Sequence, residues 1–398
     1  MSLFSLVLVN LGRNKLRTAL TVLSVVVALF LFCSLRGVLD TLAASIRVGS
    51  EARLVTRNAI SLIFPLPPAY RERLAAQPGV KTVSWGNWFG GRDPVDPGDF
   101  YAQFAVDAAT YFPVYASDID LILAARPQGP GVVPAGVDPK LAAFFEDRTG
   151  CVVGEKLFRR KKWRLGQTVT VSGTIFPGPW PFVIRAVYRA KDPAFGEEAL
   201  LFHWKYLEEK GMGGSGAVGW YVLELSDPGQ AGSVSRAVDA LYENSAAATR
   251  TETERAFQAG FVSMYGNVPF LVGLIGFAVV FAILLVAANT MMMATRERTG
   301  EYAVLKTLGF DDRTVFLLVL AEGAVLTLSA GLAGSLLAKL VLEGSGFNAG
   351  GFLPPMTVSW TTVAAGIGIA VFMGAVSGVF PAVRASRLNI VEALRRVD

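Results

Sequence analysis

The feature that most restricts the fold of this chain is a set of four long apolar runs. A membrane-spanning helix needs about 20 mostly apolar residues, because the hydrocarbon layer is about 30 Å thick and a helix rises about 1.5 Å per residue. The segments that meet this requirement are residues 18–35, 256–295, 314–338 and 344–383. The third contains one acid, Glu322, and the others contain no charged residue. We therefore expect an α-helical integral membrane protein with four transmembrane helices.

The composition supports a membrane environment. Hydrophobic residues make up 52% of the chain and charged residues 17%, whereas a soluble domain carries about 25% charged residues. A competing interpretation of the first run is a cleaved signal peptide, with Arg13, Lys15 and Arg17 as its basic start and residues 42–44 as a weak cleavage site. Signal peptides usually have an apolar region of about 7–15 residues, so we expect an uncleaved anchor.

Basic residues beside the apolar runs set the expected orientation. They precede the first run, lie between the second and third, and follow the fourth: Arg13, Lys15, Arg17, Arg296, Arg298, Lys306, Arg313, Arg384, Arg387, Arg395 and Arg396. Short cytoplasmic segments carry an excess of Lys and Arg. We therefore expect a multi-pass membrane protein with both termini in the cytoplasm. The net charge of +5 then comes from membrane flanks and does not indicate nucleic-acid binding.

These runs divide the chain into the following expected parts. They are a cytoplasmic interfacial amphipathic helix (1–17), a first transmembrane helix with a stalk (18–40), an extracytoplasmic domain (41–255), a stalk with the second helix (256–295), a cytoplasmic loop (296–313), the third helix (314–338), a short outer loop (339–357), the fourth helix (358–383) and a cytoplasmic tail (384–398).

The large domain between the first two membrane helices is expected to be α+β. Alternation and turn signals predict helices at 69–77, 201–210 and 229–244, strands at 80–85, 167–171, 181–188 and 220–225, and a strand turning into a helix at 152–160. Its aromatic side chains are expected to fill the core, although they also suit a binding surface for an apolar molecule: Trp85, Trp88, Phe89, Trp163, Trp180 and Phe182. We expect no disulfide between Cys33 and Cys151, and the single histidine, His203, leaves little room for a histidine-based zinc site.

Motifs for enzymatic chemistry are absent from the sequence. Residues 211–216 match G-x-G-x-x-G, but a predicted helix precedes them and a strand follows, which is the reverse of the dinucleotide-binding arrangement. The sequence contains no Gly-Lys dipeptide, so a phosphate-binding P-loop is excluded. We expect no enzyme activity, no cofactor and no metal in this chain itself.

Two features inside the apolar runs predict contacts between helices. Glu322 is expected to make a structural polar contact with another helix rather than to relay protons, so that Glu322→Gln should spare assembly and activity. Gly374 and Gly378 form G-x-x-x-G, and Gly331 and Ser335 have the same spacing; small residues at this spacing let helix backbones approach closely.

Three segments on the expected cytoplasmic side carry more specific motifs. The first is an amphipathic stretch followed by a basic cluster with Asn14, Lys15 and Arg17. The second is R-E-R-T-G-E-Y-A-V-L-K-T-L-G, whose matching positions are Arg296, Glu297, Arg298, Glu301, Leu305, Lys306 and Gly309. The third is P-A-V-R-A-S-R-L-N-I-V-E-A-L, with Pro381, Ala382, Arg384, Ala385, Leu388, Glu392, Ala393 and Leu394.

Together these segments resemble the FtsX/MacB superfamily (type VII) of ABC transporter permeases. Residues 153–157 and 165–169 also resemble the MacB-like periplasmic core domain. Asn389-Ile390 stands where Asp-Pro is more usual in the family. Since no ATPase domain is present in the sequence, the chain is more similar to stand-alone four-helix permeases such as LolC and LolE.

The resemblance implies a permease subunit that works with separate ABC ATPase subunits, which bind ATP and Mg. It further implies location in the inner (cytoplasmic) membrane, a second permease copy (the same chain or a sister permease), a possible periplasmic adaptor or acceptor protein, and contact with membrane lipid. The segment at 296–313 would be the helix that couples to the ATPase, with its charges toward the partner and its apolar side packed. ATP-driven closure would change the shape of the outer domain (mechanotransmission), for export or extraction of a substrate that the sequence does not identify. The alternative implied role is an FtsX-like transmembrane regulator of a cell-wall hydrolase, and a receptor outside the ABC class is a third interpretation.

Overall fold

The computed structural model describes residues 10, 13–96, 98–192, 195–214, 216–263, 266–345 and 356–388. The chain divides into two compact units. The first, here called the helical unit, comprises residues 1–40, 267–346 and 356–398. The second, here called the α/β unit, comprises residues 41–266 and 347–355.

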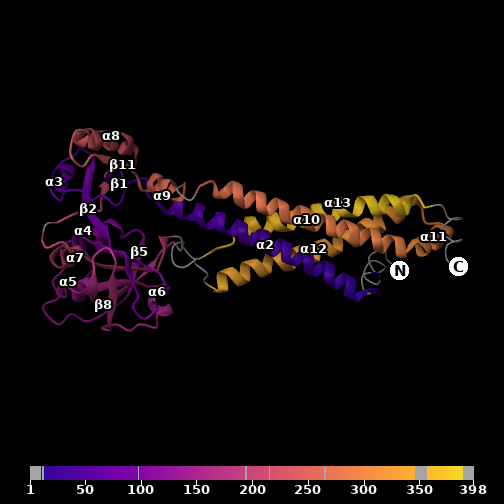
Figure 1. The fold of residues 1–398 in the computed structure, drawn as a ribbon, viewed down its shortest axis with the longest axis horizontal. Helices are drawn as coiled ribbons and strands as arrows, with labels where there is room; N and C mark the ends of the chain where they lie inside the picture. Colours follow the sequence, from indigo (N-terminus) through magenta and orange to yellow (C-terminus); the bar gives the residue numbers. More distant parts are fainter. Residues whose placement is uncertain are drawn as a thin grey trace. The chain divides into compact units, whose positions relative to one another are not determined.

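Among the described residues, four helices are long and apolar enough to cross a membrane. They are α2 (Lys15–Val48), α10 (Val268–Glu297), α12 (Asp312–Ser345) and α13 (Trp360–Ser386), and the short helix α11 (Thr299–Thr307) joins α10 to α12 (Figure 1). Side-chain caps begin two of them: Asn267 accepts a hydrogen bond from the backbone N–H of Phe270, and Ser359 accepts one from that of Thr362. The expected four-helix membrane protein with an α+β insertion after the first helix is confirmed.

Small residues let α12 and α13 pack at close range. A Cβ built on Gly374 would lie 2.3 Å from Thr327 Oγ1 and 3.0 Å from Ala324 Cα, and one built on Gly378 would lie 3.2 Å from Leu320 Cδ1. Gly331 of α12 likewise faces α13, because a Cβ there would lie 2.3 Å from the Cβ of Ala370. The two glycines singled out in the fourth apolar run thus lie where the backbones of two helices meet.

The strands described in the α/β unit form one mixed sheet of 11 strands, in the order β11-β1-β10-β2-β4-β9-β6-β8-β7-β3, with β5 paired to β8. Their bounds are β1 (Arg53–Asn58), β2 (Val80–Trp88), β3 (Gly91–Arg92), β4 (Ala102–Val106), β5 (Ile119–Ala124), β6 (Gly150–Gly154), β7 (Thr168–Gly173), β8 (Gly178–Ala190), β9 (Ala199–His203), β10 (Trp220–Leu225) and β11 (Thr249–Thr253). The β4–β9 and β6–β8 pairs are parallel and the other pairs are antiparallel.

Short helices cover this sheet. They are α3 (Tyr70–Ala75), α4 (Ala108–Val114), α5 (Ala142–Glu146), α6 (Glu155–Arg160), α7 (Trp204–Gly211), α8 (Ala231–Tyr242) and α9 (Glu254–Ser263), with the 3-10 turns η1 (Pro139–Leu141) and η3 (Pro228–Gln230). α8 lies over β11 and β1 (Figure 1) and buries Val234, Val238 and Tyr242 against the larger hydrophobic core. Its apolar spacing of four residues predicts this buried face.

One element of the sequence prediction is wrong. The helix expected at 201–210 begins only at Trp204, because residues 199–203 form β9 instead. The segment Ala-Leu-Leu-Phe-His lies between β4 and β6 in the sheet, and its Leu200 and Phe202 are fully buried. A short apolar run without alternation is typical of a strand covered on both faces, which periodicity alone does not distinguish from a helix.

The aromatic residues mostly fill the core, as expected. Phe89, Trp180 and Phe182 are at most 1% exposed, and Trp85 and Trp163 pack against the same core. Trp88 is an exception at 38% exposure, although Phe100 and Phe104 lie against its ring. Both cysteines are free and buried.

Candidate functional site

The candidate site is α11 together with the helix ends that surround it, at residues 10–17, 296–322 and 381–388. α11 ends where Gly309 adopts a φ of +95°, a conformation that favours glycine. The backbone N–H of Phe310 then donates to the carbonyl of Leu305. Asp311 accepts a hydrogen bond of 3.0 Å from the backbone N–H of Thr314 and so starts α12. These local signals fold the segment into a short helix between two long ones.

The inner face of α11 is packed against the long helices. Tyr302 and Ala303 are at most 2% exposed, and Tyr302 belongs to a small core with residues of α12 and α13, including Val319 and Ala385. Lys306 donates to the carbonyl oxygens of Ser386 and Leu388 at the end of α13, the latter at 3.1 Å. It also lies 2.8 Å from the carboxylate of Asp312. α11 is therefore held to both helices on this side.

Glu322 is paired with a basic side chain, as the sequence suggested it could be. Both of its oxygens accept hydrogen bonds of 3.0 Å from Arg298. Asn10 adds a bond of 2.5 Å from its Nδ2 to Glu322, and its backbone carbonyl accepts one of 2.6 Å from Arg298. Since the side chains of Arg298 and Glu322 are only 16% and 12% exposed, this is a buried contact between three segments.

Two further ion pairs tie the start of α2 to the region of α11. Arg17 donates to both oxygens of Glu297 at 2.7 and 2.6 Å, and Arg13 is paired with Glu301. These pairs are more exposed, so each is worth little by itself. Their geometric effect is to occupy both glutamates within this chain.

The outward face of α11 differs from the arrangement expected from the sequence. We expected its charges to meet a partner and its apolar side to be packed, with Val304, Leu305 and Leu308 together. The structure buries part of Leu305 but leaves Val304 48% and Leu308 71% exposed, and the neighbouring Phe310 is 42% exposed. We call Val304, Leu308 and Phe310 the apolar patch. It is the feature that sequence reasoning missed, although the spacing of 304 and 308 placed both on one helix face.

The other residues singled out in the sequence have identifiable positions. Asn14 lies before α2 and its side chain accepts a hydrogen bond of 3.4 Å from the backbone N–H of Arg17. Lys15 and Arg296 are exposed, Pro381 is buried within α13, and Arg384 is exposed near the end of that helix. Glu392 lies outside the described residues.

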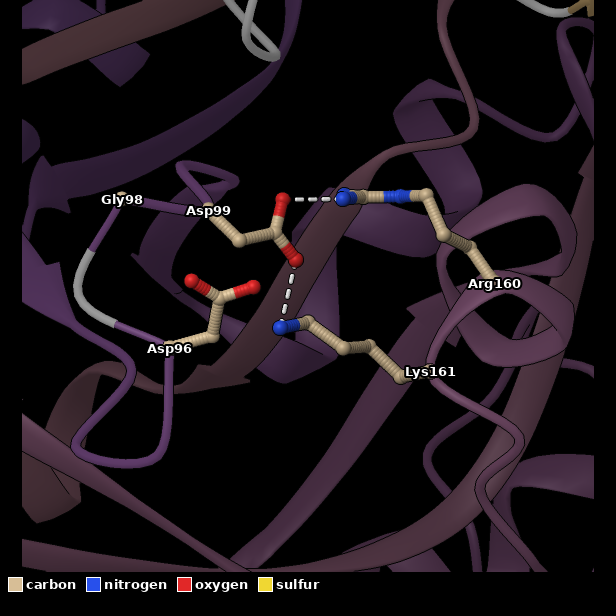
Figure 2. A pocket seen from close by; sticks show the side chains of 5 residues that line it. All are labelled: Asp96, Gly98, Asp99, Arg160 and Lys161. Atoms are coloured by element: carbon tan, nitrogen blue, oxygen red, sulfur yellow. Dashed lines mark hydrogen bonds and ion pairs between the residues drawn. The ribbon is translucent and has the colours of Figure 1, made fainter.

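A hollow beside α6 is lined by Asp96, Gly98, Asp99, Arg160 and Lys161 (Figure 2). Asp99 is paired with both basic residues, and Lys161 also lies 2.7 Å from Asp93. Burial alone would raise the pKa of Asp99, but hydrogen bonds from Lys161 and Arg160 hold it below its ordinary value. These ion pairs hold Asp93 and Asp99 beside the end of α6. Asp96 is exposed and has no ion pair among the described residues, and nothing else in this hollow indicates a ligand.

No group of metal-ligating side chains occurs within the part of the chain that the structure describes. His203 lies in the core, 5% exposed, with its Nε2 2.7 Å from the carbonyl oxygen of Phe144 and its ring stacked on that residue. Burial lowers the pKa of His203 to about 4. A neutral, enclosed imidazole of this kind is a core residue.

Comparisons with known proteins show which family the helical unit is similar to. Residues 273–390 match the FtsX-like permease C-terminal domain. The chain is 33% identical over 111 residues to the uncharacterized ABC transporter permease YknZ of Bacillus subtilis, which covers 27% of this chain and 26% of that protein. It is 32% identical over 158 residues to the macrolide export ATP-binding/permease protein MacB of Nitrobacter winogradskyi, covering 39% of this chain and 22% of that protein. The matches thus span about a quarter of the length of these relatives.

A solved structure is similar to part of this chain. The periplasmic region of MacB from Actinobacillus actinomycetemcomitans covers 54% of this chain and 95% of its own length, at 13% identity and a TM-score of 0.37.

Proposed function

We propose that this chain, an FtsX/MacB-type protein by its domain at residues 273–390, is the permease subunit of an ABC transporter. In this proposal a separate ATPase subunit binds ATP and Mg and docks on α11 from the cytoplasm. The chain lies in the inner membrane with both termini in the cytoplasm and the α/β unit outside. Two permease copies, identical or sister chains, assemble over two ATPases, and the outer domain handles a substrate for export or extraction, with a periplasmic adaptor or acceptor as a further partner.

The apolar patch is the observation that carries this proposal. Three large apolar side chains are exposed on a short helix whose surroundings are charged: Val304, Leu308 and Phe310, flanked by Arg296, Asp311, Asp312 and Arg313. Contiguous exposed apolar surface with a polar rim is typical of a protein contact. Since Glu297 and Glu301 are occupied by Arg17 and Arg13, we assign recognition of the ATPase to the patch and to the exposed charges around it.

The contacts around α11 suit a transmitting role. Displacement of α11 would be passed to α12 through Arg298 and Glu322, to α13 through Lys306, and to α2 through Arg17 and Glu297. α2 in turn is one unbroken helix from Lys15 to Val48, five residues before β1 begins at Arg53. This continuity supports mechanotransmission as the proposed mechanism.

The regulator of a cell-wall hydrolase remains the alternative function. The relatives with similar sequences carry the names of ABC transporter permeases and macrolide export proteins, which favours the transporter. A hydrolase that co-purifies with the chain, in place of a transport partner, would favour the regulator.

The test is to express this chain together with its neighbouring genes, purify it in mild detergent, and measure whether an ATPase co-purifies. Leu308→Ser should reduce the recovered ATPase about ten-fold or more, because it removes an anchor of the docking surface. Leu340→Ser is the matched control, since Leu340 is a leucine of the same unit with the same 71% exposure and lies near the other end of α12. A chain that purifies alone and supports no nucleotide hydrolysis would refute the transporter.

A charge swap separates the two possible roles of Glu301. If Glu301 pairs with Arg13 as in the structure, Glu301→Arg should weaken coupling and Arg13→Glu together with Glu301→Arg should restore it. If Glu301 instead binds the ATPase, the double variant stays as impaired as the single one.

A further inference from the structure

The chain enters and leaves the sheet of the α/β unit at one place. Residues 49–53 lead from α2 into β1, and residues 253–255 lead from β11 into α9. We call these two segments the chain crossings. They are in contact, because a Cβ built on Gly49 would lie 2.7 Å from the Cα of Arg255. The backbone N–H of Ser50 donates to the carboxylate of Glu254 at 3.0 Å. The entering and leaving segments are therefore fixed to each other by backbone as well as side-chain contacts.

A buried ion-pair cluster lies where these crossings meet. Arg53 and Glu254 are 5% and 7% exposed, and Arg53 Nε donates to Glu254 Oε2 at 2.8 Å. A second nitrogen of Arg53, Nη1, donates to Asp118 Oδ2 at 2.6 Å. The guanidinium of Arg53 also stacks 4.5 Å above the ring of Tyr115, whose hydroxyl donates to the other oxygen of Glu254 at 3.0 Å.

Asp118 connects this cluster to a distant part of the sheet. It lies between α4 (Ala108–Val114) and β5 (Ile119–Ala124). β5 pairs with β8, which is six places from β1 in the strand order. The bond between Arg53 and Asp118 therefore joins two regions that the strand ladder connects only through β10, β2, β4, β9 and β6.

Stability alone does not account for such a cluster. Well-packed apolar residues in place of a buried ion pair are often as stable or more stable, because the charges lose their hydration. What the charged groups supply is a fixed geometry: a guanidinium with several donors holds two carboxylates in defined directions. A rigid link between the chain crossings and a distant part of the sheet makes the two move as one body, so that a displacement of the crossings also displaces that part of the sheet.

We infer that Arg53, Glu254 and Asp118 form a rigid joint that makes β5 and its partner β8 move together with the two chain crossings. The role of this joint in transport rests on the proposed function, in which movement arrives along α2. Without the joint, that movement would be spread over the intervening strand pairs of the sheet and the apolar packing of Tyr115 against Val222 of β10.

The test measures a distance across the joint in the full chain, reconstituted with its ATPase in lipid nanodiscs. Spin labels are attached to Arg47→Cys on α2 and Asp120→Cys on β5, both exposed positions of the α/β unit, after replacement of the buried Cys33 and Cys151 by alanine. The test variant is Asp118→Ala. The matched control is Glu252→Ala, because Glu252 is also paired with an arginine of β1, Arg57, and the two carboxylates have similar side-chain exposures of 20% and 17%.

The joint predicts a narrow distance distribution in the wild type and in Glu252→Ala. Asp118→Ala should broaden that distribution about two-fold or more, because one of the two carboxylates that fix Arg53 is lost. If the Asp118→Ala protein is folded by tryptophan fluorescence and keeps the wild-type width, the inference is wrong. Should Asp118→Ala not fold, Asp118→Asn keeps the size and one acceptor, and the same comparison applies. If the proposed function is wrong, no ATPase will co-purify with the wild-type chain. The width of the distance distribution measured without ATPase still tests the joint in that case.

Discussion

Removal of Arg298 alone should destabilise the helical unit more than removal of Arg298 and Glu322 together. The perturbations are Arg298→Met, Glu322→Leu and the double variant. Two hydrogen bonds of 3.0 Å join the side chains, which are 16% and 12% exposed. Charges about 4 Å apart at an effective dielectric constant of about 20 attract by about 4 kcal/mol. Most of that attraction offsets lost hydration, so each single variant, which strands one buried charge, should cost about 3–5 kcal/mol.

The double variant removes the charges together with their desolvation cost, so we expect a loss below about 2 kcal/mol and a coupling energy of about 3 kcal/mol or more. The assay is unfolding of the full chain in detergent by denaturant titration, arranged as a double-mutant cycle. The exposed pair Arg13 and Glu301 serves as control, because side chains that are 58% and 48% exposed should couple by less than about 1 kcal/mol. Additive losses at Arg298 and Glu322 would refute this reasoning. The cycle also bears on Glu322→Gln: we now expect it to weaken assembly, since it leaves the charge of Arg298 without its carboxylate.

Three further outcomes are expected. Burial lowers the pKa of His203 to about 4 in the folded protein, whereas the pKa in the unfolded chain is about 6.5. The neutral form of His203 therefore contributes fully to stability above about pH 6.5, and up to about 3 kcal/mol of that stability is lost as the pH falls through about 4. In denaturant titrations, His203→Gln should remove this loss of stability at low pH. Gly374→Leu should lower the unfolding temperature, because a Cβ at this position would lie 3.0 Å from Ala324 Cα. Gly368→Leu in the same helix should leave the unfolding temperature unchanged, because nothing lies within 4 Å of a Cβ there. Asp40 accepts hydrogen bonds from Ser359 N, Ser359 Oγ and Thr362 Oγ1 at the start of α13. Asp40→Ala should therefore lower the free energy of unfolding by about 1 kcal/mol and speed amide hydrogen exchange in the first turn of α13. An unchanged exchange rate would exclude this capping role.

The membrane helices and the family could be predicted from the sequence because their signals are local. An apolar run of sufficient length admits few structures in lipid, and the motifs at 296–309 and 381–388 are contiguous. The resemblance to the FtsX/MacB superfamily is confirmed by the match at residues 273–390. In the α/β unit the strand expected at 220–225 is β10, with the same bounds, because alternating residues there lie between Gly219 and Pro228.

Other elements could not be predicted because their signals are not local. β11, Thr-Arg-Thr-Glu-Thr, contains no apolar residue, and it is a strand because it pairs with β1 and lies under α8. The direction of each side chain of α11 depends likewise on its neighbours. Helical periodicity places Val304 and Leu308 on one face, but the side that α12 and α13 cover follows from their packing around Tyr302. The assignment of Glu297 and Glu301 to the ATPase stays a prediction, and their intrachain pairs favour a different role.

The unbroken course of α2 has a consequence for how this chain can vary. Each residue of a helix turns it by about 100° and lengthens it by about 1.5 Å. A single insertion or deletion between Lys15 and Val48 would therefore change the angular phase of every later residue of the helix relative to every earlier one. Substitutions that keep the apolar character of α2 are compatible with the fold. Changes in its length are compatible only where the phase returns to within about 20°, as it does after about 7 or about 11 residues.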